Sequence, residues 1–346
     1  GEEKSNRREN QAPERRGPTR EVRDSKSGRV VAIAFHFLDF VSQFGGGQVA
    51  RIHSHLEPFA ERSKGIDGHF PDRLAGKIPP HGVLQAPDPG SDVAGIRTRA
   101  EPVDRGYRLN GAKIWCTNSS VADFVLVAAR ITDNNDPSKR GSLNLFIVER
   151  DTAGFTIGPA EDKMGARGVP SCPLFLDNAF VPAEKRLGPE RLGFKIVMEA
   201  FNQSRPIIGA RGVGLAQGAM DLAVEFVRQR EAFGQQVSNF QGVRWMIADM
   251  AIQTEAARGL VYRAAAMVDD GISGKELAQA AAIAKAQATD TAMSVATDAV
   301  QLFGAAGISN DYPINRYFRD AKVLQIVEGT NQIQRNIIAN ELIGRN

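Results

Sequence analysis

Residues 107–130 read YRLNGAKIWCTNSSVADFVLVAAR, and this stretch decides the fold class of the middle of the chain. Its apolar and β-branched residues form short runs separated by turn residues, a pattern typical of strands. Asn110-Gly111 is a two-residue hairpin signal, so we expect a turn there, one strand through Trp115 and another at 124–130. Similar runs follow at 143–150, 155–159 and 173–182. Because no helical period intervenes, we predict a middle antiparallel β-barrel or sandwich domain over residues 83–190.

Beyond Gly193 the pattern becomes helical to the end of the chain. Apolar residues recur at helical spacing in four segments, at 194–230, 240–271, 275–303 and 331–343. The alanine-rich stretch at 280–296 permits close approach of neighbouring helices, and 271–274 and 303–313 supply loops. We therefore predict a C-terminal α-helical bundle over residues 191–346, and an α+β fold for the chain.

The first 82 residues differ from the rest in composition. Residues 1–28 are rich in charge and poor in apolar side chains, which predicts a disordered tail. Residues 29–82 contain all five histidines, and helical periodicity can be drawn only through 30–43 and 49–62. Neither His53 nor His55 has cysteine or carboxylate companions at metal-ligand spacing, so no metal site is expected.

The charge balance argues against nucleic acid as a partner. The formal net charge is +3, but residues 1–30 carry nine Lys/Arg against six Asp/Glu, and the remainder is balanced at 34 each. The excess of basic residues therefore belongs to the tail, and no basic stripe with interleaved aromatic residues occurs elsewhere.

The two cysteines and the apolar runs predict a location in a reducing compartment, away from the membrane. Cys116 and Cys172 lie in strand-like stretches without metal-ligand spacing, which suits the cytoplasm or a compartment such as the mitochondrial matrix. The apolar stretch at 30–40 is interrupted by His36 and Asp39 and lacks a clear cleavage site, so we predict no signal peptide. No run reaches the roughly 18 residues of a membrane span.

Residues 324–336, LQIVEGTNQIQRN, place one carboxylate, Glu328, after two apolar residues and before Gly329. One interpretation makes the segment a helix start, with Gly329 adopting an unusual backbone and Thr330 as the N-cap. The other keeps this architecture and makes Glu328 a proton acceptor in a desolvated pocket. These residues alone favour the first interpretation.

Four separate motifs share one resemblance. They are PDPGSDVAG at 87–95, KIWCTNSSVADFVLVAAR at 113–130, the segment from FNQSRP to IADM at 201–250, and the segment from QLFGAAG to NQIQR at 301–335. In this order and at this spacing they resemble the acyl-CoA dehydrogenases, flavoproteins that oxidise an acyl-CoA thioester to its 2-enoyl form. The resemblance covers residues 83–346. It implies FAD as cofactor, acyl-CoA as substrate, electron-transfer flavoprotein as acceptor, a homotetramer, and a role in fatty acid and lipid metabolism.

The resemblance also implies a role for individual residues. Glu328 coincides with the catalytic base of the family. Contacts with FAD are implied for Leu84, Gln85, Ser91, Trp115, Cys116, Thr117, Arg230, Phe233, Gln241, Gln301, Gly304, Ala305, Thr330 and Gln332. Contacts with the substrate are implied for Ser91, Asn202, Ser204, Arg205 and Gly329. The chain departs from the family where Gln85-Ala86 replaces a Thr-Glu pair, and in its shortened N-terminal region. The resemblance implies that residues 29–82 are an atypical remnant of the family's N-terminal helical domain.

Desaturation of an acyl thioester removes a proton from Cα and a hydride from Cβ, which requires a carboxylate on one face of the substrate and flavin N5 on the other. The sequence leaves two alternatives open. The reduced flavin could react with oxygen, which would make the chain an acyl-CoA oxidase. The atypical first 82 residues could also leave a silent structural subunit of the same fold.

Overall fold

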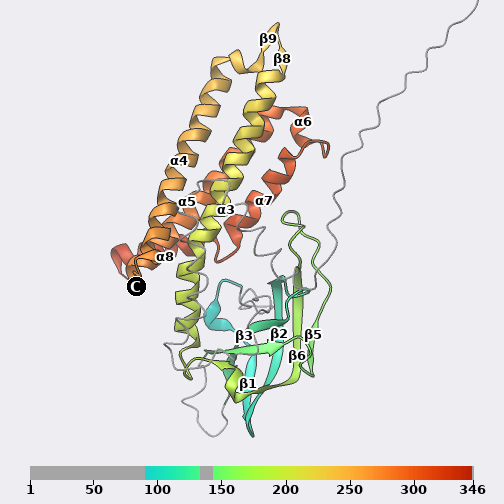
Figure 1. The fold of residues 1–346 in the computed structure, drawn as a ribbon, viewed down its shortest axis with the longest axis vertical. Coiled ribbons are helices and arrows are strands. Elements are labelled where there is room, and N and C mark those ends of the chain that lie inside the picture. The colour runs from blue at the N-terminus through green and yellow to red at the C-terminus, as the bar shows by residue number, and fades with distance from the viewer. Residues whose placement is uncertain (1–89, 133–142, 345–346) are drawn as a thin grey trace, which may run out of the picture. The chain divides into compact units, whose positions relative to one another are not determined.

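The structure is a computed structural model that describes residues 90–132 and 143–344 (Figure 1). All of these residues belong to one compact unit, Ala50–Asn346. The predictions for residues 1–82, and for Leu84 and Gln85, lie outside the described residues. No helix in the described ranges is long and apolar enough to cross a membrane.

The middle of the chain forms a seven-stranded sheet in the order β5-β6-β2-β1-β3-β4-β7. Its strands are β1 Arg99–Val103, β2 Gly106–Thr117, β3 Phe124–Ile131, β4 Leu143–Glu149, β5 Phe155–Ile157, β6 Ser171–Pro182 and β7 Arg186–Leu187. Neighbours pair antiparallel except β1 and β3, whose short parallel pairing makes the sheet mixed. The predicted β-domain is therefore present, with an open strand order among the described strands.

Alternation of buried and exposed side chains builds the core of the β-domain. Leu109, Val127, Phe146 and Leu174 come from four strands and lie in one buried cluster. β4 is buried along almost its whole length, because Leu143 and Leu145 pack in a second cluster with Val197 at the start of the first long helix. Burial on both faces explains why this strand reads as a continuous apolar run.

The hairpin predicted at Asn110-Gly111 is wrong, because both residues lie inside β2. The turn between β1 and β2 is at Asp104-Arg105, where Val103 pairs with Gly106 and Arg105 has a φ of 59°. The pairing of β2 with β6 shifts register between Leu109 and Gly111. Gly111, at a φ of 142°, therefore lies in a β-bulge. A β-bulge favours glycine, as a hairpin turn does.

The C-terminal part is a helical bundle, as predicted. Its helices are α3 Gly193–Gln229, α4 Gln241–Asp269, α5 Gly274–Phe303, α6 Ala305–Ile308, α7 Ile314–Ile326 and α8 Asn331–Ile343. Figure 1 shows α3, α4 and α5 running side by side, with a hairpin of β8 Glu231–Ala232 and β9 Gln235–Gln236 between α3 and α4. The sequence did not predict α6, α7 or the strands β1, β7, β8 and β9.

Small residues set the spacing of α3 and α5. A Cβ added at Gly212 of α3 would meet the carbonyl oxygen of Ala288 of α5 at 2.8 Å. Further along the same pair of helices, Ala216, Ala219 and Ala223 share a buried cluster with Ala292 and other residues of α5. The alanine-rich composition thus allows the close approach that the sequence indicated.

Candidate active site

Glu328 lies in the short loop between α7 and α8 and has an unusual backbone. Its φ is 57°, in the left-handed region that costs a side-chain-bearing residue about 1–2 kcal/mol, and Gly329 follows with a φ of 88°. Thr330 then caps α8, since its side chain accepts a hydrogen bond from the N–H of Ile333 at 3.4 Å. The expected helix start is confirmed, and the strained Glu328, three residues before the first residue of α8, is the one acid of the loop.

Two residues of α3 contact Glu328, and a third residue of the same helix holds one of them. Ser204 donates from Oγ to Glu328 Oε2 at 2.8 Å, and the neighbouring Arg205 donates from Nε to the backbone oxygen of Glu328 at 3.4 Å. Asn202 accepts from Nη1 of Arg205 at 3.0 Å. Pro206 follows inside the helix and lacks the N–H that would bond to the carbonyl of Asn202, so one backbone hydrogen bond of α3 is absent there. The structure thus brings together four of the predicted site residues.

The electrostatics around Glu328 are asymmetric. Arg205 is 3% exposed, and its guanidinium is directed to the backbone oxygen of Glu328 and to Asn202. Burial lowers the pKa of Arg205, and the negative charge of Glu328 acts in the opposite direction. The half-buried carboxylate of Glu328 has a hydroxyl partner, Ser204, as its hydrogen-bond donor within the described residues. Such a carboxylate keeps lone pairs available for a proton.

A buried amide fixes the carbonyl groups next to the carboxylate. Gln334 of α8 is fully buried and donates from Nε2 to the oxygens of Glu328, at 3.3 Å, and Gly329, at 2.8 Å. A Cβ on Gly329 would come within 2.9 Å of the same Nε2. Glycine at 329 is therefore required by both the backbone angle and the space.

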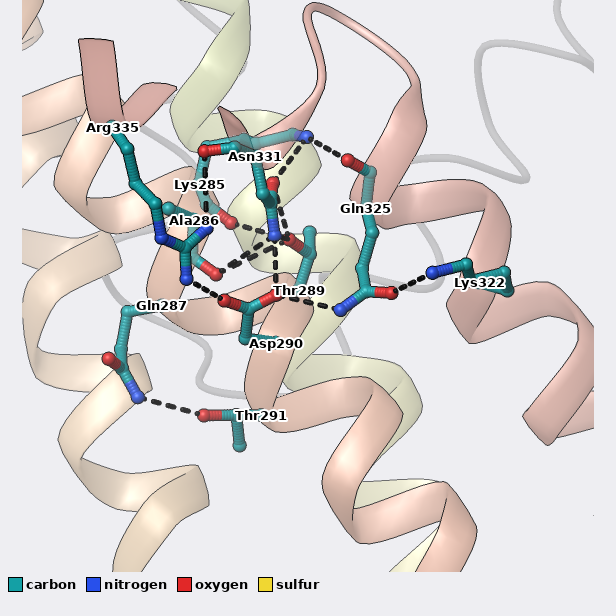
Figure 2. A network of polar contacts seen from close by, with 10 residues as sticks. All are labelled: Lys285, Ala286, Gln287, Thr289, Asp290, Thr291, Lys322, Gln325, Asn331 and Arg335. Carbon is teal, nitrogen blue, oxygen red and sulfur yellow. Dashed lines mark hydrogen bonds and ion pairs between the residues drawn. The ribbon is translucent and has the colours of Figure 1, made fainter. Parts of the chain in front are cut away.

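A second polar cluster contacts the loop from α5 and was missed by the sequence analysis (Figure 2). It contains Lys285, Asp290 and Asn331, of which Lys285 is fully buried. A signal was present in the sequence, because Lys285 falls on the helix face formed by Ala281, Ala288 and Ala292. A lysine on an alanine face requires partners, although the sequence does not identify them.

The residues predicted from the second motif lie at an irregular point of β2. Trp115 has a φ of 58° and is 50% exposed, at a register shift between Lys113 and Cys116. Thr117 is half-buried, and Ser91 is exposed in the segment before β1. The side chain of Cys116 instead lies in the core, and burial raises the pKa of its thiol to about 12. Any contact of Cys116 with a ligand would therefore use its backbone.

The remaining predicted FAD residues gather at one end of the bundle, far from Glu328. Arg230, Phe233, Gln241, Gln301, Gly304 and Ala305 are all exposed. Phe226 of α3 stacks on Phe303 of α5 at this end, with ring centroids 4.1 Å apart. At 1.5 Å per residue, Arg230 lies about 39 Å along α3 from Ser204. Within one chain, the structure does not bring this set to the carboxylate.

The described residues contain no group of three or more His, Cys, Asp or Glu that could hold a metal ion. The other predicted residue of the last motif, Gln332, is exposed in the first turn of α8. It lies two residues after Thr330, so both side chains are near the loop that carries Glu328.

Two family models match the chain. The acyl-CoA dehydrogenase middle domain matches residues 85–179, and the acyl-CoA dehydrogenase C-terminal domain matches residues 191–343. The first covers the described sheet from β1 to most of β6, and the second covers the bundle. The resemblance to the acyl-CoA dehydrogenases is therefore confirmed at the level of the family, for the β-domain and for the helical bundle.

Individual relatives agree with the family models. The "Probable acyl-CoA dehydrogenase FadE25" of Mycobacterium tuberculosis is 44% identical, over 75% of this chain and 66% of its own length. Cyclohexane-1-carbonyl-CoA dehydrogenase of Geobacter metallireducens is 43% identical, over 75% of this chain and 67% of its own. The chain thus spans about two thirds of the length of these relatives.

A solved structure shows the same arrangement in three dimensions. Butyryl-CoA dehydrogenase from Megasphaera elsdenii superposes with a TM-score of 0.73 at 41% identity, covering 78% of this chain and 69% of that one. Together with the two family models, this places the fold and the sequence in one group of proteins. The chain belongs to the acyl-CoA dehydrogenase family.

Proposed function

We propose that the chain catalyses the α,β-desaturation of an acyl-CoA thioester, with Glu328 as the base that takes the Cα proton. The observation that carries this proposal is the state of the Glu328 carboxylate. It is half-buried on a strained backbone and hydrogen-bonded to a hydroxyl, while Arg205 donates to the backbone oxygen of Glu328 rather than to the carboxylate. Strain and selective hydrogen bonding of this kind are common at catalytic groups.

The residues around the carboxylate have separate tasks in this proposal. Ser204 orients the carboxylate through Oε2, which leaves Oε1 to face the Cα proton. Arg205, whose guanidinium also donates to Asn202, holds the adjoining backbone, and Gly329 allows the substrate to approach closely. As the proton leaves, negative charge grows on the thioester oxygen, and the N–H of Glu328 is suited to donate to it.

FAD is the cofactor proposed for the hydride step, and the exposed side chains fit it. Trp115 offers a half-exposed aromatic face and Thr117 a hydroxyl, which suit a flavin ring. Arg230 and Gln241 offer the fork and the amide that bind a pyrophosphate and the groups next to it. When bound, FAD would supply the acceptor of the hydride from Cβ.

The two sets of FAD residues require two chains. The set at Arg230 lies about 39 Å along α3 from Ser204, farther than one flavin nucleotide extends. We therefore propose that Arg230, Phe233, Gln241, Gln301, Gly304 and Ala305 contact the cofactor of a neighbouring subunit, in the homotetramer that the family resemblance implies. Phe233, which is 96% exposed, is the residue whose burial such an assembly would change most.

The substrate class and the electron acceptor extend this proposal. Relatives are named for cyclohexane-1-carbonyl-CoA and butyryl-CoA, so these thioesters are the first substrates to test. The proposed acceptor is electron-transfer flavoprotein. Rapid reoxidation by oxygen alone would instead make the protein an oxidase.

Anaerobic flavin reduction tests the proposal directly. The full chain is purified, loaded with FAD and mixed with each thioester, and bleaching of the flavin absorbance is followed. Glu328→Gln should slow bleaching by about 10²- to 10⁴-fold, the usual contribution of a general base. Glu255→Gln, on the exposed surface of α4, is the matched control and should react like the wild type. Bleaching at the wild-type rate in Glu328→Gln would show that Glu328 is not the base.

A further inference from the structure

Lys285 is a buried charge that the proposed chemistry does not use. It lies in α5 between Ala284 and Ala286 and is fully buried. Lysine is rarely found at such depth unless each hydrogen of its ammonium group has an acceptor. Its partners therefore indicate what it does.

The three acceptors of Lys285 all belong to the segment that carries Glu328. Nζ donates to the backbone oxygens of Gln325, at 3.2 Å, and Gly329, at 3.0 Å, and to Oδ1 of Asn331, at 2.8 Å. Gln325 is in the last turn of α7 and Asn331 is the first residue of α8. One ammonium group, with three hydrogens, thus joins both ends of the loop and the residue next to Glu328.

Asn331 extends the connection to a second point on α5 (Figure 2). Its Nδ2 donates to Asp290 Oδ1 at 2.6 Å and to Thr289 Oγ1 at 2.9 Å. Asp290 also accepts from the side chains of Gln325 and Arg335, each at 2.7 Å. Although burial acts to raise the pKa of Asp290, hydrogen bonds from Arg335, Asn331 and Gln325 outweigh it and lower the pKa. The anion therefore anchors α7 and α8 to the same turn of α5.

Side chains of three helices hold the loop. Lys285 binds the carbonyls of residues 325 and 329 from α5, while Arg205 and Gln334 bind the carbonyl of residue 328 from α3 and α8. A left-handed backbone at Glu328 persists only where surrounding contacts enforce it. Lys285 supplies three contacts to the 325–331 segment, and it does so without touching the carboxylate.

We propose that Lys285 is a positioning residue for the reaction, which fixes the 325–331 segment so that the Glu328 carboxylate faces Ser204 and the substrate. The catalytic part of this inference rests on the proposed function. The structural part, that Lys285 keeps the segment closed, does not, and it is measured separately.

The charges around Lys285 make the tether sensitive to pH. The pKa of Lys285 is lowered to about 7, because the lowering by burial and by Arg205 of α3 exceeds the raising by Asp290 of α5 and Glu328 of the loop. Arg335 of α8 faces Asp290 rather than the lysine. Opening of the loop would hydrate the ammonium, so opening is most favourable below about pH 7 and becomes less favourable as the pH rises above it.

Lys285→Met removes the donors while keeping the length of the side chain, and Lys322→Met is the matched control. Lys322 is exposed and donates at 2.9 Å to the side chain of Gln325 rather than to the loop backbone. Hydrogen exchange of the amides at 327–334 measures the tether in both variants at pH 6, where the Lys285 ammonium keeps its three hydrogens. Flavin reduction by butyryl-CoA and cyclohexane-1-carbonyl-CoA measures its catalytic consequence.

In Lys285→Met, the amides of residues 327–334 should exchange faster than in the wild type. The amides of residues 250–264 in α4 should exchange at the wild-type rate. The variant should also reduce flavin about 10- to 100-fold more slowly, the effect expected of a misplaced catalytic group, while the KM changes by less than about threefold. Lys322→Met should match the wild type in both measurements. Wild-type exchange in Lys285→Met would overturn the tether, and faster exchange with a wild-type rate would overturn the positioning role.

Two further results separate the possible failures. If wild-type protein bleaches with neither thioester, the proposed function fails, while the exchange data still decide the tether. If Lys285→Met does not fold, Lys285→Gln, which keeps two donor hydrogens, replaces it and should give intermediate exchange. Should both variants fail to fold, the wild-type protein is measured at pH 6 and pH 8. After correction for the intrinsic effect of pH on amide exchange, exchange at 327–334 should be slower at pH 8. An equal corrected rate at the two pH values would contradict the inference.

Discussion

Two places in the chain share a local backbone but differ in what enforces it. Glu328-Gly329 has φ values of 57° and 88°, and Phe233-Gly234 has φ values of 52° and 78°. The second pair is the two-residue turn of the β8–β9 hairpin, a geometry that strongly favours a left-handed residue before glycine. The first pair joins two helices and is held by side chains of α3, α5 and α8. One conformation is therefore set locally, and the other by tertiary contacts.

Phe233 and Glu328 also differ in exposure, because the hairpin turn needs no surrounding contacts whereas the loop between α7 and α8 does. Phe233 is 96% exposed and touches Phe240 edge-to-face, with ring centroids 6.1 Å apart. Glu328 is half-buried, and it accepts from Ser204 at its carboxylate and from Arg205 and Gln334 at its backbone oxygen. A hairpin tip can present a side chain to a neighbouring subunit without internal support. A catalytic carboxylate needs a fixed direction, and the surrounding network supplies it.

The largest effect should come from breaking the network behind the Glu328 loop. Asn331→Ala would leave Lys285 and Asp290 without their shared partner inside the protein, and should lower the free energy of unfolding by about 3 kcal/mol. Phe233→Ala, at the hairpin tip, should change it by less than about 0.5 kcal/mol in a monomeric preparation. Urea unfolding of both variants, followed by circular dichroism, measures the contrast. Equal losses would mean that the network is not what stabilises the loop.

The second test replaces the glycine at each place by alanine. Gly329→Ala meets both an unfavourable φ and the Nε2 of Gln334 at 2.9 Å, so a loss of about 2–3 kcal/mol is expected. Gly234→Ala has nothing within 4 Å and meets only the unfavourable φ, so about 1 kcal/mol is expected. Thermal unfolding of the two variants gives the difference. If Gly234→Ala lowered the melting temperature more than Gly329→Ala, contact of the added Cβ with Gln334 would not be what requires glycine at position 329.

Sequence reasoning succeeded where the cause is local. The strand runs, the long amphipathic helices and the N-cap at Thr330 are properties of contiguous residues, and the structure contains them. It failed at Asn110-Gly111 because a bulge and a hairpin turn both favour glycine at positive φ, and only strand pairing distinguishes them. It missed α7 although Ile314, Tyr317, Phe318 and Ala321 have helical spacing and share one core cluster, so this helix was available from the pattern.

In the candidate site, too, the residues with a local sequence signal could be predicted, and their tertiary contacts could not. Glu328, Ser204 and Arg205 could be named from motifs, although the contact of Ser204 with the carboxylate depends on packing of α3 against a loop 124 positions later. Lys285 could be recognised as unusual on an alanine face, but its acceptors at 325, 329 and 331 are not adjacent to it in the sequence. A network that joins three segments is a property of the folded chain.

The pH dependence of the free energy of unfolding should differ between the Glu328 loop, which contains the ionisable Lys285 contact, and the uncharged hairpin tip at Phe233. In the folded protein the pKa of Lys285 is lowered to about 7 by burial, against 10.5 for the free side chain. Between these values the unfolded chain binds more protons than the folded chain, so this group makes the protein more stable as the pH rises from 7 towards 10. The expected slope is about 1 kcal/mol per pH unit relative to Lys285→Met, in which it should vanish. Phe233→Ala should keep the wild-type slope, and urea unfolding at pH 7, 8 and 9 measures all three proteins.

The smallest expected effect concerns the hydroxyl that touches the carboxylate. Ser204→Ala removes the 2.8 Å hydrogen bond to Oε2 of Glu328 but leaves the backbone tethers from Arg205, Gln334 and Lys285 in place. The carboxylate then keeps its position and loses only part of its orientation, so flavin reduction should slow about fivefold, equivalent to about 1 kcal/mol. Ser238→Ala, beside the β8–β9 hairpin, is the matched control and should leave the rate unchanged. A loss of a hundredfold or more in Ser204→Ala would mean that the hydroxyl, rather than the backbone network around Lys285, aims the base.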